Sequence, residues 1–210
     1  MIIGPKKTGR PSLYPDARGN ILKAAQTLFG ECGFEAVSIS QIAKQAGLPK
    51  ANVLYYYPNK DDLWREAVDH LWQEVTTFYF AKLHPPVEVS LKGFAHFLRT
   101  YFMACRAFPA YVQIPFLEGQ TDNWRSRYLA DKYVRSHHMG ARKFIIKLSN
   151  AGIIRPINIA VLHSLIAGGG QMVIGQSFLW RYALHESLTE AEFDQFYIES
   201  VLDIFKMPGT

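Results

Sequence analysis

Apolar residues recur every three or four positions along most of this chain, which is the spacing of one face of an α-helix. The two-residue alternation of a half-buried strand does not occur, and the sequence holds no internal repeat. The pattern therefore predicts an all-α protein of about nine helices. The predicted helices cover residues 16–33, 38–46, 50–57, 60–83, 89–107, 111–119, 124–151 and 156–184, and a last helix begins at 189.

The stretch 38–60 carries the strongest local signals for helix starts and stops. Ser38 followed by Gln41 is the pattern of a capping box, in which each residue satisfies a free backbone N–H of the other. Gly47 suits the end of that helix, and Pro49 suits the start of the next, because its missing N–H would have no helical partner there. Pro58 stops the second helix. The stretch is thus predicted to form two short helices joined by a tight turn.

The second of these helices separates its residues into two faces. Val53 and Tyr57 lie four positions apart and face a core, which turns the polar residues outward. A short helix with amides, phenols and an ammonium on its outer face suits the major groove of DNA. The predicted outward residues are Lys50, Ala51, Asn52, Tyr55 and Tyr56.

Residues 16–65 together resemble the DNA-binding domain of the TetR family of transcriptional regulators. The variant NVLYYYPNK is most similar to the branch that contains the pyrimidine-utilisation regulator, and the rest of the chain agrees with the family in length and helical character only. The matching residues are Ile21, Leu22, Ala24, Ala25, Leu28, Phe29, Gly33, Phe34, Ser38, Ile42, Ala43, Ala46, Gly47, Tyr56, Pro58, Lys60 and Leu63.

The resemblance implies a dimeric, ligand-responsive regulator, usually a repressor, and it implies roles for individual residues. Three positions depart from the commonest family pattern, since Pro49 replaces a serine, Asn52 a threonine and Leu54 a tyrosine, so base preference is not transferable from relatives. The resemblance implies that Ser38, Tyr56 and Lys60 bind phosphates of the DNA backbone. It implies that the residues facing the bases are Ser40, Lys50, Ala51, Asn52 and Tyr55.

The chain is predicted to divide into a flexible basic arm (1–14), a helix-turn-helix domain (15–60) and a larger helical domain for effector binding and dimerisation (61–210). The formal charge of the whole chain is +5, and all of this excess lies in residues 1–60, because the other 150 residues hold equal numbers of cations and anions. Such a charge distribution is expected of a domain that binds phosphates. The arm either lies in a minor groove through Arg10 or attracts phosphates without specificity.

The predicted helix at 156–184 is apolar on nearly every side, and a helix of this kind is buried all round. A second copy of the chain is the expected cover. The resemblance implies a homodimer through the last two helices, and two-fold symmetry implies a palindromic operator. Three consecutive glycines, Gly168, Gly169 and Gly170, lie inside this helix. They either allow two helices to approach closely at the dimer interface or leave space for a ligand beside the helix.

The second domain is rich in aromatic residues with a few amides among them, which suits a cavity for a planar or aromatic effector. The absence of a clear buried cation disfavours a strongly anionic effector. Gln171 is the first candidate, although a hydrogen bond between helices explains a buried amide equally well. The candidate ligand contacts are Trp72, Tyr101, Phe116, Gln171 and Phe178.

Motifs of enzymes, cofactors and metal sites are not found, so we expect neither catalysis nor a bound cofactor. Cys32 and Cys105 are predicted to be buried free thiols, and His137 and His138 a surface pair. No apolar run matches a membrane span and the first residues lack a secretory signal, so the expected location is cytoplasmic. An all-α sensor or an α-helical enzyme without specific DNA binding remains the alternative.

Overall fold

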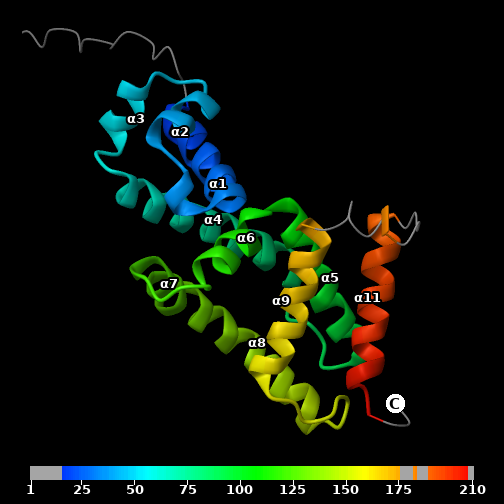
Figure 1. The fold of residues 1–210 in the computed structure, drawn as a ribbon. Coiled ribbons are helices and arrows are strands. Elements are labelled where there is room, and N and C mark those ends of the chain that lie inside the picture. Colours follow the sequence, from blue (N-terminus) through cyan, green and yellow to red (C-terminus); the bar gives the residue numbers. More distant parts are fainter. Residues whose placement is uncertain (1–15, 176–181, 184–188, 208–210) are drawn as a thin grey trace, which may run out of the picture.

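The computed structural model describes residues 16–175, 182–183 and 189–207, and this part of the chain is helical without strands. One long and two short helices form a head at one end, a fourth helix leads out of it, and the remaining helices form a larger body (Figure 1). The all-α prediction is therefore confirmed. The helices are α1 (Ala17–Ala36), α2 (Ile39–Gln45), α3 (Lys50–Tyr56), α4 (Lys60–Leu83), α5 (Leu91–Ala107), α6 (Ala110–Glu118), α7 (Trp124–Leu129), α8 (Arg135–Asn150), α9 (Ile159–Gly175) and α11 (Glu190–Phe205).

Side-chain caps fix where most of these helices begin. The predicted capping box is present, since Ser38 N donates to Gln41 Oε1 at 2.8 Å and Gln41 N donates to Ser38 Oγ at 3.2 Å. Thr189 and Glu192 form the same reciprocal pair before α11. Gly33 has a φ of 78°, so the predicted end of the first helix is a break within α1, which continues to Ala36.

The predicted helix at 124–151 is divided by a π-helical turn. Ala130–Val134 adopts this wider winding between α7 and α8, although the chain continues in one direction. A π-turn inserts an extra residue into the helix and rotates the side chains on either side of it. It carries Tyr133 to α4, where the ring stacks on Trp72 with 4.8 Å between ring centroids.

Two apolar cores run through the described residues. The first joins head and body without a gap, because it contains Ile21 and Val53 of the head together with Trp64 and Ile114 of the body. The predicted domain boundary coincides with the first residue of α4, but packing continues across it. The second core joins α5, α8, α9 and α11 around Phe94, Leu98, Phe102, Leu148 and Ile198.

Two of the three consecutive glycines of α9 serve packing within the chain, whereas Gly168 has open space beside it and lines a cavity. A Cβ on Gly169 would collide with the Tyr197 ring of α11, and one on Gly170 would lie 2.7 Å from Tyr101 Oη of α5. Tyr197 Oη crosses over Gly169 and donates to Leu165 O at 2.7 Å. Neither the dimer seam nor a ligand is needed to explain these two glycines, because α5 and α11 of the same chain approach α9 closely there.

Within a single chain the apolar helix is not buried on every side, and its cover by a second copy of the chain stays a prediction. Val161, Leu165 and Met172 of α9 are exposed, as are Phe196 and Ile204 of α11. No helix in the part of the chain that the structure describes is both long and apolar enough to cross a membrane.

Candidate nucleic-acid interface and effector cavity

The turn between α2 and α3 sets the orientation of α3. Gly47 adopts a φ of 68°, which is accessible to glycine at no steric cost, and Leu48 N donates to Ala43 O at 2.9 Å. Leu48 and Val53 are buried against the head. The opposite side of α3 consequently lies at the outer edge of the head, away from the body (Figure 1).

The structure places most predicted DNA contacts on this outer edge. The side chain of Tyr55 is 83% exposed, whereas Asn52 is half-buried at the margin of the face. The Ser38 hydroxyl already donates to Gln41 Oε1 at 2.7 Å, so a phosphate would share it with the capping box. The predicted contacts with exposed side chains are Ser38, Ser40, Lys50, Ala51, Tyr55 and Tyr56.

Lys60 has a structural role that the sequence did not indicate. Its ammonium donates to Phe34 O at 2.8 Å and to Val37 O at 3.0 Å, and it lies 4.1 Å from the centre of the Phe34 ring. Two of its three N–H donors thus close the end of α1. The predicted contact of Lys60 with a DNA phosphate therefore has to use its third N–H donor. That contact stays a prediction.

Phe34 also connects the head to the body. The Arg125 guanidinium of α7 lies 4.1 Å from the centre of the ring, on which the Lys60 ammonium also lies. Arg125 is buried and donates to Glu118 Oε2 at 2.8 Å and to Glu35 Oε1 at 3.1 Å. This charged cluster therefore ties α1, α6 and α7 together directly beneath the head.

A second polar cluster holds α4 against the π-turn. Asp69 accepts hydrogen bonds from Tyr128 Oη at 2.6 Å, Lys132 Nζ at 2.7 Å and the Tyr133 hydroxyl. Partial burial alone would raise the pKa of Asp69, but the hydrogen bonds from Lys132, Tyr128 and Tyr133 together outweigh burial and lower it. The carboxylate is thus held ionised one helical turn before Trp72.

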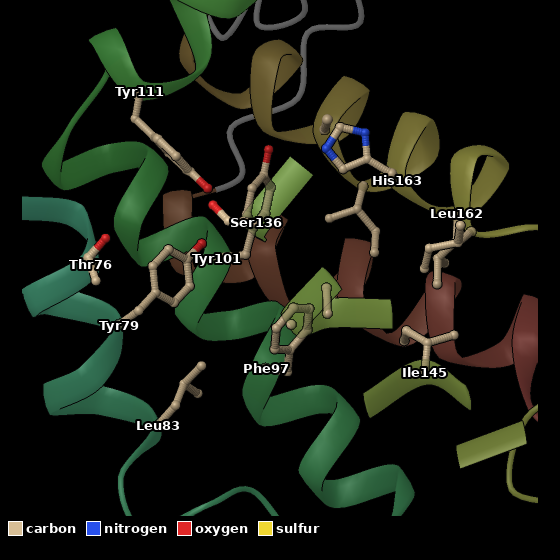
Figure 2. Close-up of a pocket in the computed structure, with 15 residues that line it drawn as sticks. Thr76, Tyr79, Leu83, Phe97, Tyr101, Tyr111, Ser136, Ile145, Leu162 and His163 are labelled. Carbon is tan, nitrogen blue, oxygen red and sulfur yellow. The ribbon is translucent and has the colours of Figure 1, made fainter. Parts of the chain in front are cut away.

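Two cavities lie in the body below these clusters. The larger has a volume of about 780 Å³ and is bounded by α4, α5, α6, the π-turn and α9. The smaller has about 320 Å³ and lies between α4, α5, α6, α8 and α9. Figure 2 shows the smaller one, with three tyrosines from three different helices on the side opposite Leu162 and Ile145. The two cavities share Tyr101, Tyr111, His163 and Ala167 as a common wall.

Four of the five predicted ligand contacts line the larger cavity together, and the fifth, Phe178, lies outside the described residues. The four are Trp72, Tyr101, Phe116 and Gln171. Tyr111 and His163 were missed. Tyr111 follows a Phe–Pro break at the start of a short helix, so its sequence context gives no sign that it faces the cavities.

The cavity walls hold aromatic and aliphatic side chains with a few polar groups, among them His163, without a lysine, arginine, aspartate or glutamate among the described lining residues. Burial raises the pKa values of Tyr79, Tyr101 and Tyr111, so these phenols stay protonated. Gln171 Oε1 and Tyr101 Oη are buried without a hydrogen-bond partner. Such a site favours an uncharged ligand, because a buried charge needs a partner.

The remaining candidates for chemistry are less prominent. Cys105 is buried, and burial raises the pKa of its thiol to about 12. The prediction for Cys32 is wrong, because this thiol lies on the exposed side of α1. The described residues contain no group of histidine, cysteine and acidic side chains that suits a metal ion.

Comparison with known proteins identifies the head. Residues 21–67 match the family model described as bacterial regulatory proteins of the tetR family. The HTH-type transcriptional regulator RutR of Escherichia coli K12 is 42% identical over 60 residues, which are 28% of each chain. LmrA of Bacillus subtilis is 39% identical over 59 residues, 28% of this chain and 31% of LmrA. The alignments thus span less than a third of these curated relatives.

Solved structures match nearly the whole chain at low identity. A transcriptional regulator from Saccharomonospora viridis in complex with choline superposes with a TM-score of 0.69 at 18% identity, covering 91% of this chain and 98% of its own. The ketosteroid regulator KstR2 of Mycobacterium tuberculosis gives 0.68 at 20% identity, covering 90% and 95%. These likenesses establish the same fold for head and body together.

Proposed function

Because this chain belongs to the TetR family of bacterial regulatory proteins, we propose that it is a ligand-responsive repressor that binds a palindromic operator as a homodimer. The observation that carries the proposal is the outer face of α3. It exposes Lys50, Ala51 and Tyr55 at the edge of the head, and residues 1–60, the head together with the arm before it, hold the whole excess of positive charge. A regulator of this kind acts in the cytoplasm, where the DNA is.

The first test is fluorescence anisotropy on labelled DNA from the region upstream of the gene, across a series of salt concentrations. A regulator binds tightly, loses affinity steeply as salt rises, and is not displaced by an unrelated duplex. Lys50→Ala should weaken binding, whereas Lys143→Ala in α8, an exposed lysine of the body, serves as the matched control. Equal and weak binding to both duplexes would favour the alternative of a sensor or enzyme without specific DNA binding.

We propose that the effector is uncharged and carries a ring, because the cavities offer aromatic faces, neutral phenols and an unpaired amide oxygen. Gln171 Oε1 is positioned to accept a hydrogen bond from it. Titrations of neutral aromatic compounds, each beside its carboxylate analogue, can be followed by tryptophan fluorescence and by release of DNA. Gln171→Met keeps the side-chain size and should weaken the neutral ligand. Preference for the carboxylates would overturn this assignment.

We propose that the homodimer forms through the exposed apolar sides of α9 and α11. Val161→Glu and Phe196→Glu should shift sedimentation equilibrium toward monomer, because each would place a charge in an apolar interface. Phe80→Glu changes a similarly exposed aromatic residue on α4 and serves as the control. If the control dissociates the dimer and the other two do not, the interface lies elsewhere.

The structure offers a physical route from cavity to head. Trp72 of α4 lines the larger cavity and stacks on Tyr133, and α4 begins at Lys60, which closes the end of α1. If α4 can adopt two positions, a ligand that favours one of them by a few kcal/mol is sufficient to shift the population toward that position. The DNA-binding heads would then change their separation when the effector binds.

A further inference from the structure

Leu54 is an apolar residue on the polar outer face of α3. Its side chain is 41% exposed, while the preceding residue, Val53, is fully buried. On a helix, Leu54 lies beside Lys50 and Ala51, which are four and three positions earlier and also exposed. An exposed leucine therefore lies among the side chains proposed to enter the major groove.

The core of the head does not require this leucine. Val53 and Tyr57 are the residues of this segment that fill the core, at 0% and 3% exposure. The exposed part of Leu54 is thus available to a partner that approaches α3 from outside.

The chemistry of the base edges selects one such partner. Leucine has no hydrogen-bond donor or acceptor, so it gains nothing at the polar edges of guanine, cytosine or adenine and would desolvate them. The C5-methyl of thymine is the only apolar group that the bases present in the major groove. We propose that Leu54 packs on a thymine methyl in each half-site and is a specificity-determining residue.

This inference rests on the proposed DNA-binding function, and its test separates the two. The full-length protein is used to select binding sites from random duplexes, and each thymine of the selected site is then replaced by deoxyuridine, which removes only the methyl group. We expect one position per half-site at which this change weakens binding about fourfold, the effect of uncovering one methyl-sized apolar contact. Other thymines should show smaller effects.

Variants of Leu54 then assign the methyl contact to this residue. With Leu54→Ala the difference between thymine and deoxyuridine at that position should disappear, whereas Leu54→Met keeps an apolar side chain of similar reach and should retain it. Unchanged thermal unfolding of both variants shows that the head is folded. A methyl effect that survives Leu54→Ala, or no methyl effect at any position, overturns the inference alone. Failure to select any site overturns the DNA-binding function with it.

Discussion

Removal of the Arg125 guanidinium should destabilise the protein far more than removal of a neighbouring arginine. Arg125 is 9% exposed and its partner Glu118 is 7% exposed, so Arg125→Met would leave a buried carboxylate without its cation. Breaking a buried pair in this way costs about 3–5 kcal/mol. The bond to Glu35 adds little, because that carboxylate is 81% exposed. We expect the melting temperature to fall by roughly 6–20 °C.

The matched control lies two residues along the same helix. Arg127 pairs with Asp122 at 2.8 Å, but both side chains are largely exposed, so Arg127→Met should leave the stability almost unchanged. Urea and thermal unfolding followed by circular dichroism measure both variants. The double variant Arg125→Met with Glu118→Leu removes the stranded charge and should regain much of the stability. Equal losses for the two arginine variants, or a double variant as unstable as Arg125→Met, would refute the reasoning.

Three further predictions follow from contacts described above. Lys60→Met should lower the free energy of unfolding by about 1–3 kcal/mol, because two backbone carbonyls lose a charged donor; urea unfolding that is unchanged contradicts the capping role. Asp69→Asn should destabilise at pH 7 and flatten the acid limb of a stability–pH profile. The lowered pKa of Asp69 means that its contribution is present above the ordinary carboxyl pKa and is lost as pH falls through the folded value. Gly169→Ala should lower the free energy of unfolding by about 1–3 kcal/mol, because the added methyl group forces the Tyr197 ring away from α9. An unaltered melting curve would show that the ring moves without a cost in stability.

Local signals in the sequence located the helices well where a side chain acts on its own backbone. Ser38 and Thr189 begin helices as predicted, because capping is decided within four residues. The π-turn at Ala130–Val134 was not predicted, since the apolar period continues through it. A tertiary contact accompanies it, since Tyr133 is held by Asp69, 64 residues away in the chain.

Contacts between distant helices account for the parts of the site that the sequence did not indicate. Arg125 and Glu35 are separated by 90 residues, and nothing near either residue indicates that they pair. The aromatic composition of the second domain did predict an apolar cavity, and Trp72 and Gln171 were found on its wall. Tyr111 was not, because facing a cavity depends on how α6 packs on α4 and α5.

The length of α4 has a mechanical consequence. Twelve residues separate Trp72, at the larger cavity, from Lys60, at the base of the head, which is about 18 Å of helix. Under the proposed ligand-responsive function α4 would act as a lever with its fulcrum near the cavity, and a tilt of about 5° would displace its head end by about 1.5 Å. In a symmetric pair the two displacements add to about 3 Å, close to the 3.4 Å rise of one base pair. A tilt of a few degrees would therefore offset the two recognition helices by nearly one base step.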